Sequence, residues 1–449
     1  MLDVVIAGAG IAGMAAGISL RRAGHKVHIY ERSAMNNEVG AAIHVPPNVS
    51  RFLVRWGLDP EGAGFVKAGP IEFKDPVNQE TTVAMSHAHN KERYGADLWY
   101  AHRVDLHDAL KKKATEPQRP DTPVMIHLKS SVAGYNTELP AIRLENGDEI
   151  KADLVIGADG VHSIASETVI GRKNPPSPAS HYNCCYRFLI PKEVLEEDPE
   201  TRLFNVDSND LIRLYPDNEK SRRLVSYPCR RNTIHNFVGL FFDEEMKSVT
   251  KEDYHADFDK TLAIERFAGF HPSLQAVIGK ATDIKRWPLL YCAPLPTWRK
   301  GKLVLAGDAA HPMLPHHGQG GAMGIEDGAA LGIVLANVTN RSQIEERLEL
   351  YEKLRRNRAS AIQILSNVGF DYEEDIPKNA PEIMAFNMSY DVISEAIKVM
   401  QGADPSFAVP TQFFDEGTAS KQHASEDLTK LDSKVQTQVR LETEPIAAR

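Results

Sequence analysis

The sequence predicts an α/β fold in which a parallel sheet and an antiparallel sheet form separate parts of the chain. Three apolar stretches predict buried parallel strands, and each runs directly into a turn that contains glycine: residues 4–13, 153–160 and 302–310. Residues 179–284 instead alternate polar and apolar side chains in several short runs, which is typical of antiparallel strands with one covered face. Together these observations predict an α/β protein with an added antiparallel sheet.

The bulk composition is that of an ordinary globular protein. The chain has 449 residues, 42% hydrophobic and 25% charged, which predicts two or three domains with a large core. The net charge of −9 argues against nucleic acid or an anionic membrane as partner, because both need a basic surface. No apolar run reaches about 18 residues, and the first strand leaves no room for a signal peptide, so we expect no membrane span and a cytoplasmic location. The four cysteines form no CxxC pair and are expected to be free thiols.

The first apolar stretch has the pattern of a nucleotide-binding βαβ unit. A strand over residues 4–7 leads into the GxGxxG turn at 8–13, a helix over 14–22 and a second strand over 26–30. Because strand, turn, helix and second strand all occur in the required order, the pattern is much more specific than the glycines alone. The unit predicts a bound dinucleotide, and it does not decide between NAD and FAD.

Individual residues of this unit have separate expected roles. Gly8 permits the tight turn, Gly10 lets the backbone approach a pyrophosphate, and Gly13 lets the helix pack closely on the strand. The helix N-terminus then offers unpaired N–H groups to the phosphates. Glu31, at the end of the second strand, can accept hydrogen bonds from a ribose 2′-hydroxyl, and Arg32 beside it is a further candidate cofactor contact.

Two distant stretches repeat the arrangement of a strand that ends in glycine and aspartate. Asp159 ends the segment DLVIGAD, and Asp308 follows the segment KLVLAG. A carboxylate at a strand end can bind ribityl or ribose hydroxyls, and a glycine-rich turn can offer N–H groups to a flat ligand. In the turn before the helix that follows Asp308, the candidate contacts are Gly320, Gly321 and Ala322. The structural alternatives are that Asp308 is an N-cap and Asp159 a turn residue.

Taken together, the motifs GAGIAG, YERS, GADG and GDAAHPMLPHHGQGGAMGIEDGAAL resemble those of class A, single-component FAD-dependent monooxygenases. The chain is most similar to the salicylate-hydroxylase-like branch, which includes fungal phenol hydroxylases of polyketide and other secondary-metabolite pathways. The resemblance covers residues 1–370 and implies a p-hydroxybenzoate-hydroxylase-like fold: a Rossmann-type FAD domain with an inserted antiparallel-sheet substrate domain and C-terminal helices. The expected divisions are an FAD-binding domain (1–75, 98–178 and 285–340), a substrate-binding domain (76–97 and 179–284), a C-terminal helical region (341–414) and a tail (415–449).

The resemblance also implies cofactor contacts. Arg103 is expected to hold the ribityl-phosphate region of FAD, and Asp308 to bind the ribityl chain. The loop that reaches Gly321 is expected to lie against the isoalloxazine ring. Ala42 and Ile43 are expected to pass the other edge of that ring with backbone contacts only.

The implied reaction is the NAD(P)H- and O2-dependent hydroxylation of an aromatic, phenolic, polyketide-like substrate through a flavin C4a-hydroperoxide, with dearomatisation or decarboxylation as variants. NADPH or NADH is expected to bind transiently, because the sequence contains no second GxGxxG. The arginine that usually follows the DG pair in this family is Ser166 here. No metal is expected, since His311, His316 and His317 lack carboxylates or cysteines at a matching spacing.

Other functions stay open at this point. Within the same family, epoxidation of an isoprenoid or alkaloid substrate is the alternative to ring hydroxylation. A flavin dehydrogenase or reductase is a more remote alternative, and a non-catalytic FAD-binding scaffold is another. We expect a monomer or a homodimer that binds a small aromatic molecule.

The antiparallel part supplies the candidate catalytic residues. Arg187 lies among the apolar residues of YRFLIP, where a solvated arginine is not expected, and Tyr227 shares a strand face with Val225. A phenolate reacts faster with an electrophilic oxidant than a phenol, so a fixed positive charge and a hydroxyl donor would favour the reaction. Resemblance to the dearomatising phenol hydroxylases also implies an Arg–Tyr pair in this sheet. The next candidate pair is Arg213 with Tyr215.

The C-terminal part is expected to be helical and then flexible. Residues 342–368 have the charged and apolar pattern of a long amphipathic helix, and a second helix is expected over 390–400. Beyond Phe414 the chain contains no aromatic residue and is rich in polar side chains. Such a segment buries too little apolar surface to order itself, so residues 415–449 are expected to form a flexible tail.

Overall fold

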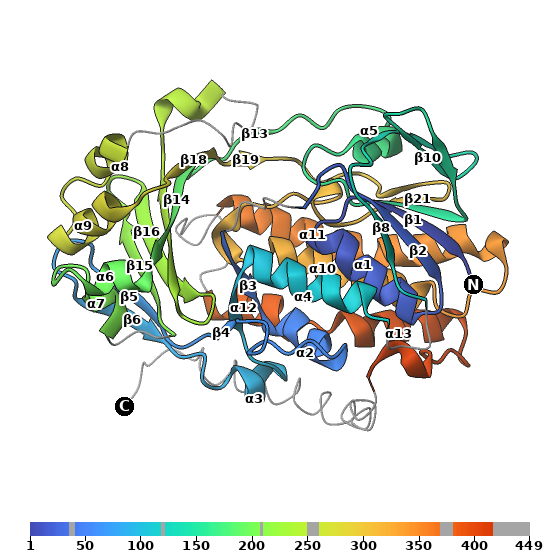
Figure 1. The fold of residues 1–449 in the computed structure, drawn as a ribbon, viewed down its shortest axis with the longest axis horizontal. Helices are drawn as coiled ribbons and strands as arrows, with labels where there is room; N and C mark the ends of the chain where they lie inside the picture. Colours follow the sequence, from blue (N-terminus) through green and yellow to red (C-terminus); the bar gives the residue numbers. More distant parts are fainter. Residues whose placement is uncertain (36–40, 118–121, 207–209, 249–259, 369–379, 416–449) are drawn as a thin grey trace, which may run out of the picture.

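The computed structural model describes residues 1–35, 41–117, 122–206, 210–248, 260–368 and 380–415. Figure 1 shows a parallel sheet at one end of the molecule, a larger sheet at the other end, and long helices between them. The expected α/β architecture, with a separate antiparallel sheet, is therefore confirmed.

The parallel sheet brings the three predicted strands together. Its strands are β1 (Asp3–Ala7), β2 (Lys26–Tyr30), β8 (Met125–His127), β12 (Leu154–Gly157), β20 (Arg299–Lys300) and β21 (Leu303–Leu305). The order is β20–β21–β12–β1–β2–β8, and every pair of neighbours is parallel except β20 and β21. Ala7, Gly157 and Leu305 pair across β1, β12 and β21. The three strand ends therefore lie level, and the turns that follow them start side by side at the carboxyl edge.

Helices cover this sheet and pack closely on one another. They are α1 (Ile11–Arg22), α4 (Arg103–Thr115), α5 (Ile164–Ile170) and α10 (Gly320–Val334). Helix α10 presents glycines to α1 at intervals of one helical turn. A Cβ at Gly328 would collide with the backbone of Ala15 and Ala16, and one at Gly332 would collide with Ser19. The close contact between the helices therefore depends on the missing side chains.

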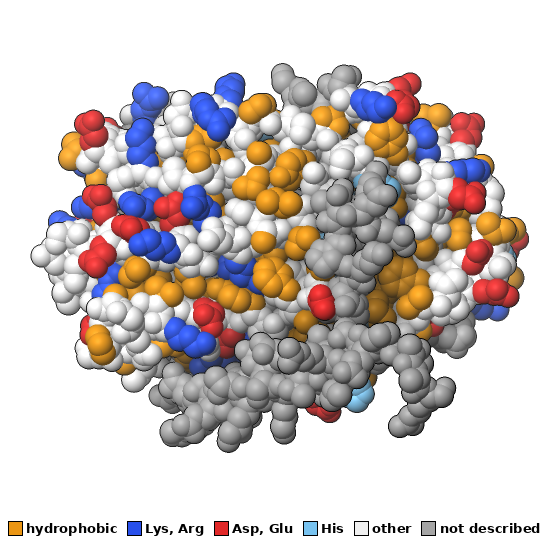
Figure 2. Space-filling view, turned by 180° about the vertical axis from the view of Figure 1, so that it is seen from behind, with side chains coloured by type: hydrophobic (Ala, Val, Ile, Leu, Met, Phe, Trp, Pro, Cys, Tyr) orange, Lys and Arg blue, Asp and Glu red, His pale blue; other side chains and the backbone are white. Residues whose placement is uncertain are grey.

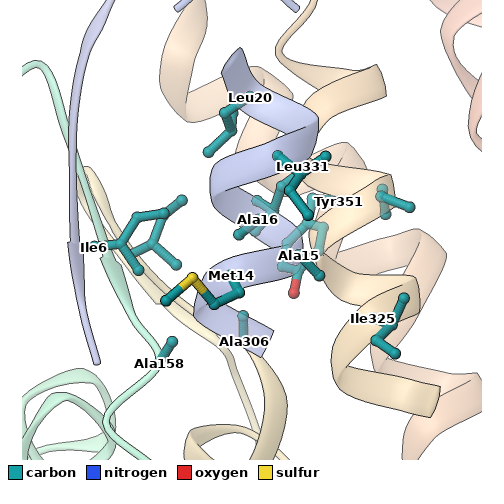
Figure 3. Close-up of a cluster of buried hydrophobic side chains, with 14 of the residues drawn as sticks. Ile6, Met14, Ala15, Ala16, Leu20, Ala158, Ala306, Ile325, Leu331 and Tyr351 are labelled. Atoms are coloured by element: carbon teal, nitrogen blue, oxygen red, sulfur yellow. The ribbon is translucent and has the colours of Figure 1, made fainter. Parts of the chain in front are cut away.

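The main hydrophobic core lies between the parallel sheet and these helices. Figure 3 shows Ile6 of β1 and Met14 of α1 in the same cluster as Leu331 of α10 and Tyr351, and these side chains are fully buried. The hydroxyl of Tyr351 donates a hydrogen bond to the carbonyl oxygen of Leu305 at 3.0 Å. This polar group is thus satisfied inside the core, and it ties the helix that carries Tyr351 to β21.

The second major sheet, called the large sheet below, has seven strands in the order β18–β14–β17–β16–β15–β5–β6. Its strands are β5 (Ile71–Lys74), β6 (Thr81–Met85), β14 (Cys184–Pro191), β15 (Ile212–Asp217), β16 (Arg222–Cys229), β17 (Ile234–Phe241) and β18 (Lys285–Pro288). All neighbours are antiparallel except β15 and β5. The strands β5 and β18 come from ranges that the sequence analysis placed in the FAD-binding domain, 1–75 and 285–340. The division into domains remains a prediction.

The outer face of the large sheet has its own hydrophobic core. It is covered by α6 (Lys192–Glu196), α7 (Leu203–Val206), α8 (Lys260–Arg266) and α9 (Pro272–Lys280). Phe188 and Phe237 from the sheet pack there with Leu274 and Val277 of α9. The opposite face is turned toward the helices and the parallel sheet (Figure 1). It is called the inner face below.

Smaller elements connect the two major sheets. A three-stranded sheet in the order β3–β7–β4 contacts the inner face through Ala42, Tyr100 and Tyr227. Its strands are β3 (Ala42–Val45), β4 (Val66–Lys67) and β7 (Trp99–His102). The remaining strands are β9 (Val132–Asn136), β10 (Ala141–Leu144), β11 (Glu149–Lys151), β13 (Ser177–Pro178) and β19 (Leu290–Tyr291). The short helices α2 (Pro47–Arg55) and α3 (Asn90–Tyr94) contact each other.

The C-terminal region is helical as expected. The long helix predicted over 342–368 is α11 (Ile344–Val368), and the helix predicted over 390–400 is α13 (Val392–Ala403). Between them lies α12 (Ala380–Ser389), for which no helix was expected from the sequence. Residues 416–449, nearly all of the predicted tail, lie outside the described residues.

The surface carries mixed charges. On the face shown in Figure 2, basic and acidic side chains are interspersed. Within the described segments, every helix is too short or too polar to cross a membrane.

Candidate functional site

The glycine turn after β1 has the geometry that a dinucleotide requires. Gly8 has a φ of +100°, and a Cβ there would collide with the carbonyl of Ala158. A Cβ at Gly13 would collide with the carbonyl of Gly8, whereas one at Gly10 would meet no atom within 4 Å. Gly10 is also the N-cap of α1 and provides no side-chain cap. The open space beside Gly10 therefore borders unpaired helix N–H groups, and it fits a phosphate.

Glu31 fastens this turn from the end of β2. Its carboxylate accepts hydrogen bonds from the backbone N–H of Ala9 at 2.9 Å and of Ser33 at 2.8 Å. His107 of α4 supports the same turn, with its Nε2 2.7 Å from the carbonyl oxygen of Ala9. Since Glu31 is only partly buried and a carboxylate has about four acceptor positions, it can still accept ribose hydroxyls. Arg32 is exposed beside it.

Asp308 lies in the turn after β21, on the wall of a cavity of about 480 Å³. Its side chain is exposed to this cavity, yet the surrounding protein displaces enough water to raise the pKa of Asp308. Coulombic interactions with His311 and Arg103 oppose this increase in pKa. Arg103, the first residue of α4, is therefore close enough to Asp308 to act on its charge. The structure thus brings together two residues that are expected to bind the same part of FAD.

Asp159 uses its carboxylate inside the protein. It accepts hydrogen bonds from the hydroxyls of Ser163 at 2.5 Å and Tyr135 at 2.9 Å. It also accepts from the backbone N–H groups of Ile164 at 3.1 Å and Ala165 at 3.2 Å, at the start of α5. These four donors support the structural alternative for Asp159, a turn residue. A direct cofactor contact by Asp159 remains a prediction.

The N-terminus of α10 meets the strand that contains Ala42 and Ile43. A Cβ at Gly321 would collide with the side chain of Ile43, so these two segments touch. A Cβ at Gly320 would meet no atom within 4 Å. Gly320, Gly321 and Ala322 form the first turn of α10, whose N–H groups have no partner within an α-helix. This corner can therefore hold one edge of a flat ring that carries hydrogen-bond acceptors.

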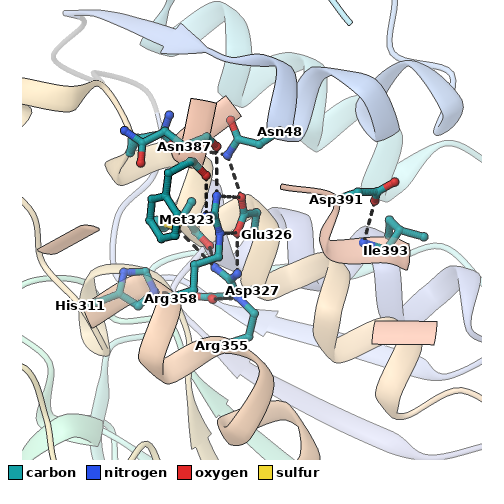
Figure 4. A network of polar contacts seen from close by, with 12 residues as sticks. Asn48, His311, Met323, Glu326, Asp327, Arg355, Arg358, Asn387, Asp391 and Ile393 are labelled. Carbon is teal, nitrogen blue, oxygen red and sulfur yellow. Dashed lines mark hydrogen bonds and ion pairs between the residues drawn. The ribbon is translucent and has the colours of Figure 1, made fainter. Parts of the chain in front are cut away.

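A network of buried charges lies behind these turns (Figure 4). Adjacent carboxylates on α10, those of Glu326 and Asp327, bind Arg355 of α11 at 2.5 and 2.8 Å. Arg358 binds Glu326 at 2.9 Å, and Asn48 of α2 donates to the same carboxylate at 2.7 Å. Burial alone would raise the pKa of Asp327, but His311 and Arg355 lower it to about 2. Both carboxylates are therefore ionised and paired, which is how proteins accommodate buried charges.

Arg187 and Tyr227 both lie on the inner face of the large sheet. Arg187 of β14 pairs with Val238 of β17, and Val238 pairs with Val225 of β16. Tyr227 lies two residues after Val225 in β16, so it points to the same face as Arg187. The Tyr227 hydroxyl donates to the carbonyl oxygen of Ala42 at 3.1 Å, so this face meets β3. Burial raises the pKa of Tyr227, and the charge of Arg187 opposes that increase. Among the described residues, Arg187 Nε has no hydrogen-bond partner.

The second candidate pair lies on the opposite face. Arg213 pairs with Ser226 and points to the outer core, where its guanidinium carbon is 6.0 Å from the ring of Phe204. The ring of Tyr215 is 6.5 Å from the same phenylalanine. The large sheet therefore separates Arg213 and Tyr215 from Ala42.

Three side chains beside Tyr227 were not identified from the sequence. The rings of His44 and Tyr100 lie 5.0 and 5.1 Å from that of Tyr227, and Asn236 Oδ1 accepts from the Ala42 N–H at 3.4 Å. Within the described part of the chain, His44 Nε2, the Tyr100 hydroxyl and Asn236 Nδ2 have no hydrogen-bond partner. Burial lowers the pKa of His44 to about 4, so its ring is neutral near pH 7. No motif marks these residues, because only the pairing of the sheets brings them together.

The histidines of the loop before α10 point to different elements. His311 Nε2 lies 2.5 Å from Asp327, and His317 Nε2 lies 3.1 Å from the carbonyl oxygen of Leu365 in α11. The ring of His316 is 5.6 Å from that of Tyr182. Over the described residues, the structure contains no group of three or more His, Cys, Asp or Glu side chains that could hold a metal ion.

Comparison with known proteins shows the family of the chain. Residues 1–365 match the family described as FAD binding domain. The FAD-dependent monooxygenase cfoG of Aspergillus candidus is 46% identical over 425 residues, which cover 92% of this chain and 98% of the relative. Hispidin-3-hydroxylase of Neonothopanus nambi is 33% identical over 422 residues, with 89% and 96% covered.

A solved structure agrees at the level of the fold. A salicylate hydroxylase in complex with its substrate superimposes with a TM-score of 0.69 at 23% identity, and 89% of this chain and 97% of that chain are covered. The expected fold class and the resemblance stated from the motifs are thereby confirmed. The open space beside Gly10 and Gly320 leaves room for the cofactor. The chain belongs to the family of FAD-dependent monooxygenases.

Proposed function

We propose that this enzyme hydroxylates a phenolic, polyketide-like aromatic compound on the inner face of the large sheet, using O2 and NADPH or NADH. The observation that carries the proposal is the shared position of Arg187 and Tyr227. Both lie on the face that contacts Ala42, in the strand that touches the N-terminus of α10. The relative hispidin-3-hydroxylase is named for the hydroxylation of a defined compound, which supports a hydroxylase.

The residues expected to hold FAD follow from the geometry of the turns. The start of α1 at Gly10 would bind the pyrophosphate, and Glu31 the adenosine ribose. Asp308 and Arg103 would hold the ribityl side, and the first turn of α10 the isoalloxazine ring. When bound, FAD takes up electrons from the nicotinamide cofactor and activates oxygen. The remaining tasks of the protein are to bind the substrate, orient it and exclude water.

Arg187 is proposed to hold the substrate oxygen as a phenolate. Its guanidinium carbon is 5.7 Å from the ring of Trp287, and its strand neighbours Cys185, Tyr186 and Phe188 are buried. In such surroundings a fixed positive charge interacts more strongly with an anion than it would in water. Deprotonation raises the electron density of the aromatic ring, so this contact favours attack by an electrophilic oxidant.

Tyr227 has two proposed functions that can be separated. Its proton is directed to the carbonyl oxygen of Ala42, which holds the strand beside the expected ring position. To donate to a substrate phenolate, the hydroxyl must leave Ala42. Tyr227→Phe should reduce the affinity for FAD if the first function dominates, and it should reduce coupled hydroxylation at unchanged FAD affinity if the second dominates.

His44, Tyr100 and Asn236 are proposed as further substrate contacts. Each has a buried polar atom without a partner among the described residues, and buried polar atoms are rarely left unpaired in a working site. The rings of His44 and Tyr100 contact that of Tyr227, and Asn236 lies on β17, between the strand of Tyr227 and the strand of Arg187. A substrate with more than one oxygen substituent could therefore be bound at two points.

Measurement of coupled turnover tests the proposal. The holoenzyme is supplied with NADPH or NADH and a series of phenolic acids, aldehydes and ketones, and NAD(P)H oxidation, H2O2 release and incorporation of 18O from 18O2 are recorded. We expect a phenol to accelerate NAD(P)H oxidation and to acquire one labelled hydroxyl oxygen. Label in an epoxide or diol of an isoprenoid or alkaloid would support the epoxidase instead, and acceleration without label would support a dehydrogenase.

The role of Arg187 has a matched control on the other face of the same sheet. Arg187→Ala should retain FAD and lower coupled hydroxylation at least tenfold, because a charge-assisted hydrogen bond contributes about 1.5–3 kcal/mol. Arg213→Ala removes an equally charged side chain from the outer face and should leave the coupling ratio unchanged, even if it lowers stability. If Arg187→Ala hydroxylates at the normal rate, the residue has a structural role only.

A further inference from the structure

The buried network behind the cofactor turns contains two residues, His311 and Asp327, that the proposed FAD contacts do not use. Both side chains are fully buried, so neither can touch a ligand, whereas Asp308 is exposed to the cavity. Their position relative to Asp308 nevertheless suggests a function for them.

We propose that Asp327 and His311 are positioning residues, which hold the turn around Asp308 so that its carboxylate faces the ribityl chain of FAD. This inference rests on the ribityl-binding role proposed for Asp308.

A single carboxylate oxygen clamps the turn on both sides of Asp308. Asp327 Oδ2 accepts a hydrogen bond from the backbone N–H of Gly307 at 2.8 Å and lies 2.5 Å from His311 Nε2. The turn is closed by its own backbone as well, because the N–H of His311 donates to the Gly307 carbonyl oxygen at 3.0 Å. The residue before Asp308 and the residue three positions after it are therefore fixed by the same side chain.

The clamp itself is held rigidly by neighbouring elements. The other oxygen of Asp327 accepts from Arg355 Nε of α11 at 2.8 Å, which fixes the orientation of the carboxylate. The ring of His311 lies 5.0 Å from the indole of Trp298. Figure 4 shows His311, Asp327 and Arg355 close together within the network. With both partners fixed, the turn has little freedom to move Asp308 away from the cavity.

The charges that face Asp308 come from three elements. Arg103 reaches it from α4, His311 from its own turn, and Asp327 from α10. His311 in turn faces Asp327, which is paired with Arg355. A change at His311 or Asp327 therefore alters the geometry and the electrostatic field at Asp308. The N–H groups expected to bind the pyrophosphate belong to another element, the start of α1 at Gly10.

The test compares ligands that contain different halves of FAD. FMN has the ribityl chain and no adenosine, whereas ADP has the adenosine and pyrophosphate and no ribityl chain. The full-length chain is depleted of FAD, and the dissociation constants of FAD, FMN and ADP are measured by calorimetric titration. The variants are His311→Leu, which removes the ring N–H, and His311→Gln, whose amide N–H can reach the same carboxylate.

The expected result is selective. His311→Leu should weaken FMN and FAD about tenfold, the effect of losing one well-placed hydrogen bond, and leave ADP unchanged. His311→Gln should recover most of the affinity. Because the residue acts through Asp308, the double variant Asp308→Ala/His311→Leu should bind FMN no more weakly than Asp308→Ala alone.

Several results would overturn the inference. Equal weakening of FMN and ADP would show a general structural role, and a full additional loss in the double variant would show that His311 acts independently of Asp308. If Asp308→Ala itself leaves FMN affinity unchanged, the ribityl role of Asp308 fails and the inference with it. If Asp308→Ala weakens FMN and His311→Leu does not, only the inference fails. Asp327→Asn, which keeps the size of the side chain, provides the same comparison if His311→Leu does not fold.

Discussion

At the scale of single residues, Asp308 has the clearest expected phenotype. Its carboxylate is exposed to a cavity, and desolvation by the surrounding protein raises its pKa. The interactions with His311 and Arg103 oppose this increase. Asp308→Ala should weaken FAD about tenfold to hundredfold, corresponding to about 1.5–3 kcal/mol for one charge-assisted hydrogen bond. Titration of the FAD-depleted chain measures this directly. Asp308→Asn is the matched control and should lose less of the affinity for FAD, because its amide can still form a hydrogen bond with a hydroxyl. If the original protein and both variants bind FAD equally well, Asp308 is only a helix cap.

His25 predicts a dependence of stability on pH. Its Nδ1 accepts from the N–H of Leu2 at 3.2 Å, its Nε2 lies 2.9 Å from the Leu335 carbonyl oxygen, and burial lowers its pKa to about 4. The unfolded chain, with a histidine pKa near 6.5, therefore binds the proton more readily between about pH 6.5 and pH 4. The free energy of unfolding should fall as the pH decreases through this window, by about 3 kcal/mol for this residue.

Urea unfolding at a series of pH values checks this prediction. His25→Gln should be less stable than the original protein at pH 7, because it loses the fit of both hydrogen bonds. Its free energy of unfolding should nevertheless decrease less steeply toward pH 4 than that of the original protein, because unfolding of the variant takes up one proton fewer. Other histidines whose pKa values are lowered by burial, among them His44 and His317 at about 4, remain in both proteins, so part of the dependence of stability on pH is kept. Identical slopes in the two proteins would contradict the assignment to His25.

At the scale of secondary-structure elements, the contact between α1 and α10 is a sensitive point. A Cβ at Gly328 would collide with the backbone of Ala15 and Ala16, which cannot yield as a flexible side chain can. Gly328→Ala should therefore destabilise the protein by about 1–3 kcal/mol in chemical denaturation. Gly402→Ala in α13 is the matched control: nothing lies within 4 Å of its Cβ, and alanine favours a helix over glycine by about 1 kcal/mol. Destabilisation by both substitutions would mean that helix packing is not the cause.

The same elements show what local sequence patterns can predict. The apolar runs at 4–7 and 154–157, and the amphipathic helix beginning near residue 342, depend on neighbours in the sequence and are found where expected. The membership of β5 in the large sheet was not predictable in this way, because Ile71 pairs with Ile212 far along the chain. A structural role for Asp159 as a turn residue was weighed as an alternative, but no pattern identifies its four donors before the fold is known.

At the scale of the whole molecule, the cofactor should be identifiable and stabilising. The purified protein should be yellow and should release FAD, not FMN, on denaturation, because Glu31 and the turn at Gly10 are placed for an adenosine diphosphate moiety that FMN lacks. Added FAD should raise the melting temperature of the FAD-depleted chain, and a concentration of 100 times the dissociation constant should contribute about 2.7 kcal/mol. Chromatography of the released flavin decides between the two cofactors. Release of FMN would contradict the assignment.

The site as a whole was only partly predictable from the sequence. Glycine turns and strand-end aspartates form local motifs, so Gly8, Gly10 and Asp308 could be named in advance. The surroundings of Tyr227 could not, because His44 and Asn236 come from different sheets and meet only when these sheets pack. The alternation of side chains along one strand shows which residues of that strand share a face. It does not relate the faces of different strands, and only the register between the strands shows that Arg187 shares a face with Tyr227 and that Arg213 does not.

The level strand ends of β1, β12 and β21 also have a consequence for biosynthesis. A ribosome delivers the chain from its N-terminus, so β1 and α1 leave the exit tunnel long before β21 (Leu303–Leu305) and α10 (Gly320–Val334) exist. Until β21 and α10 have been synthesised, the glycine turn after β1 lacks the neighbouring turn that contains Asp308, and the face of α1 that contacts Gly328 stays uncovered. Flavin capture must therefore follow the synthesis of most of the polypeptide, and a nascent chain stalled before Gly320 should not retain FAD.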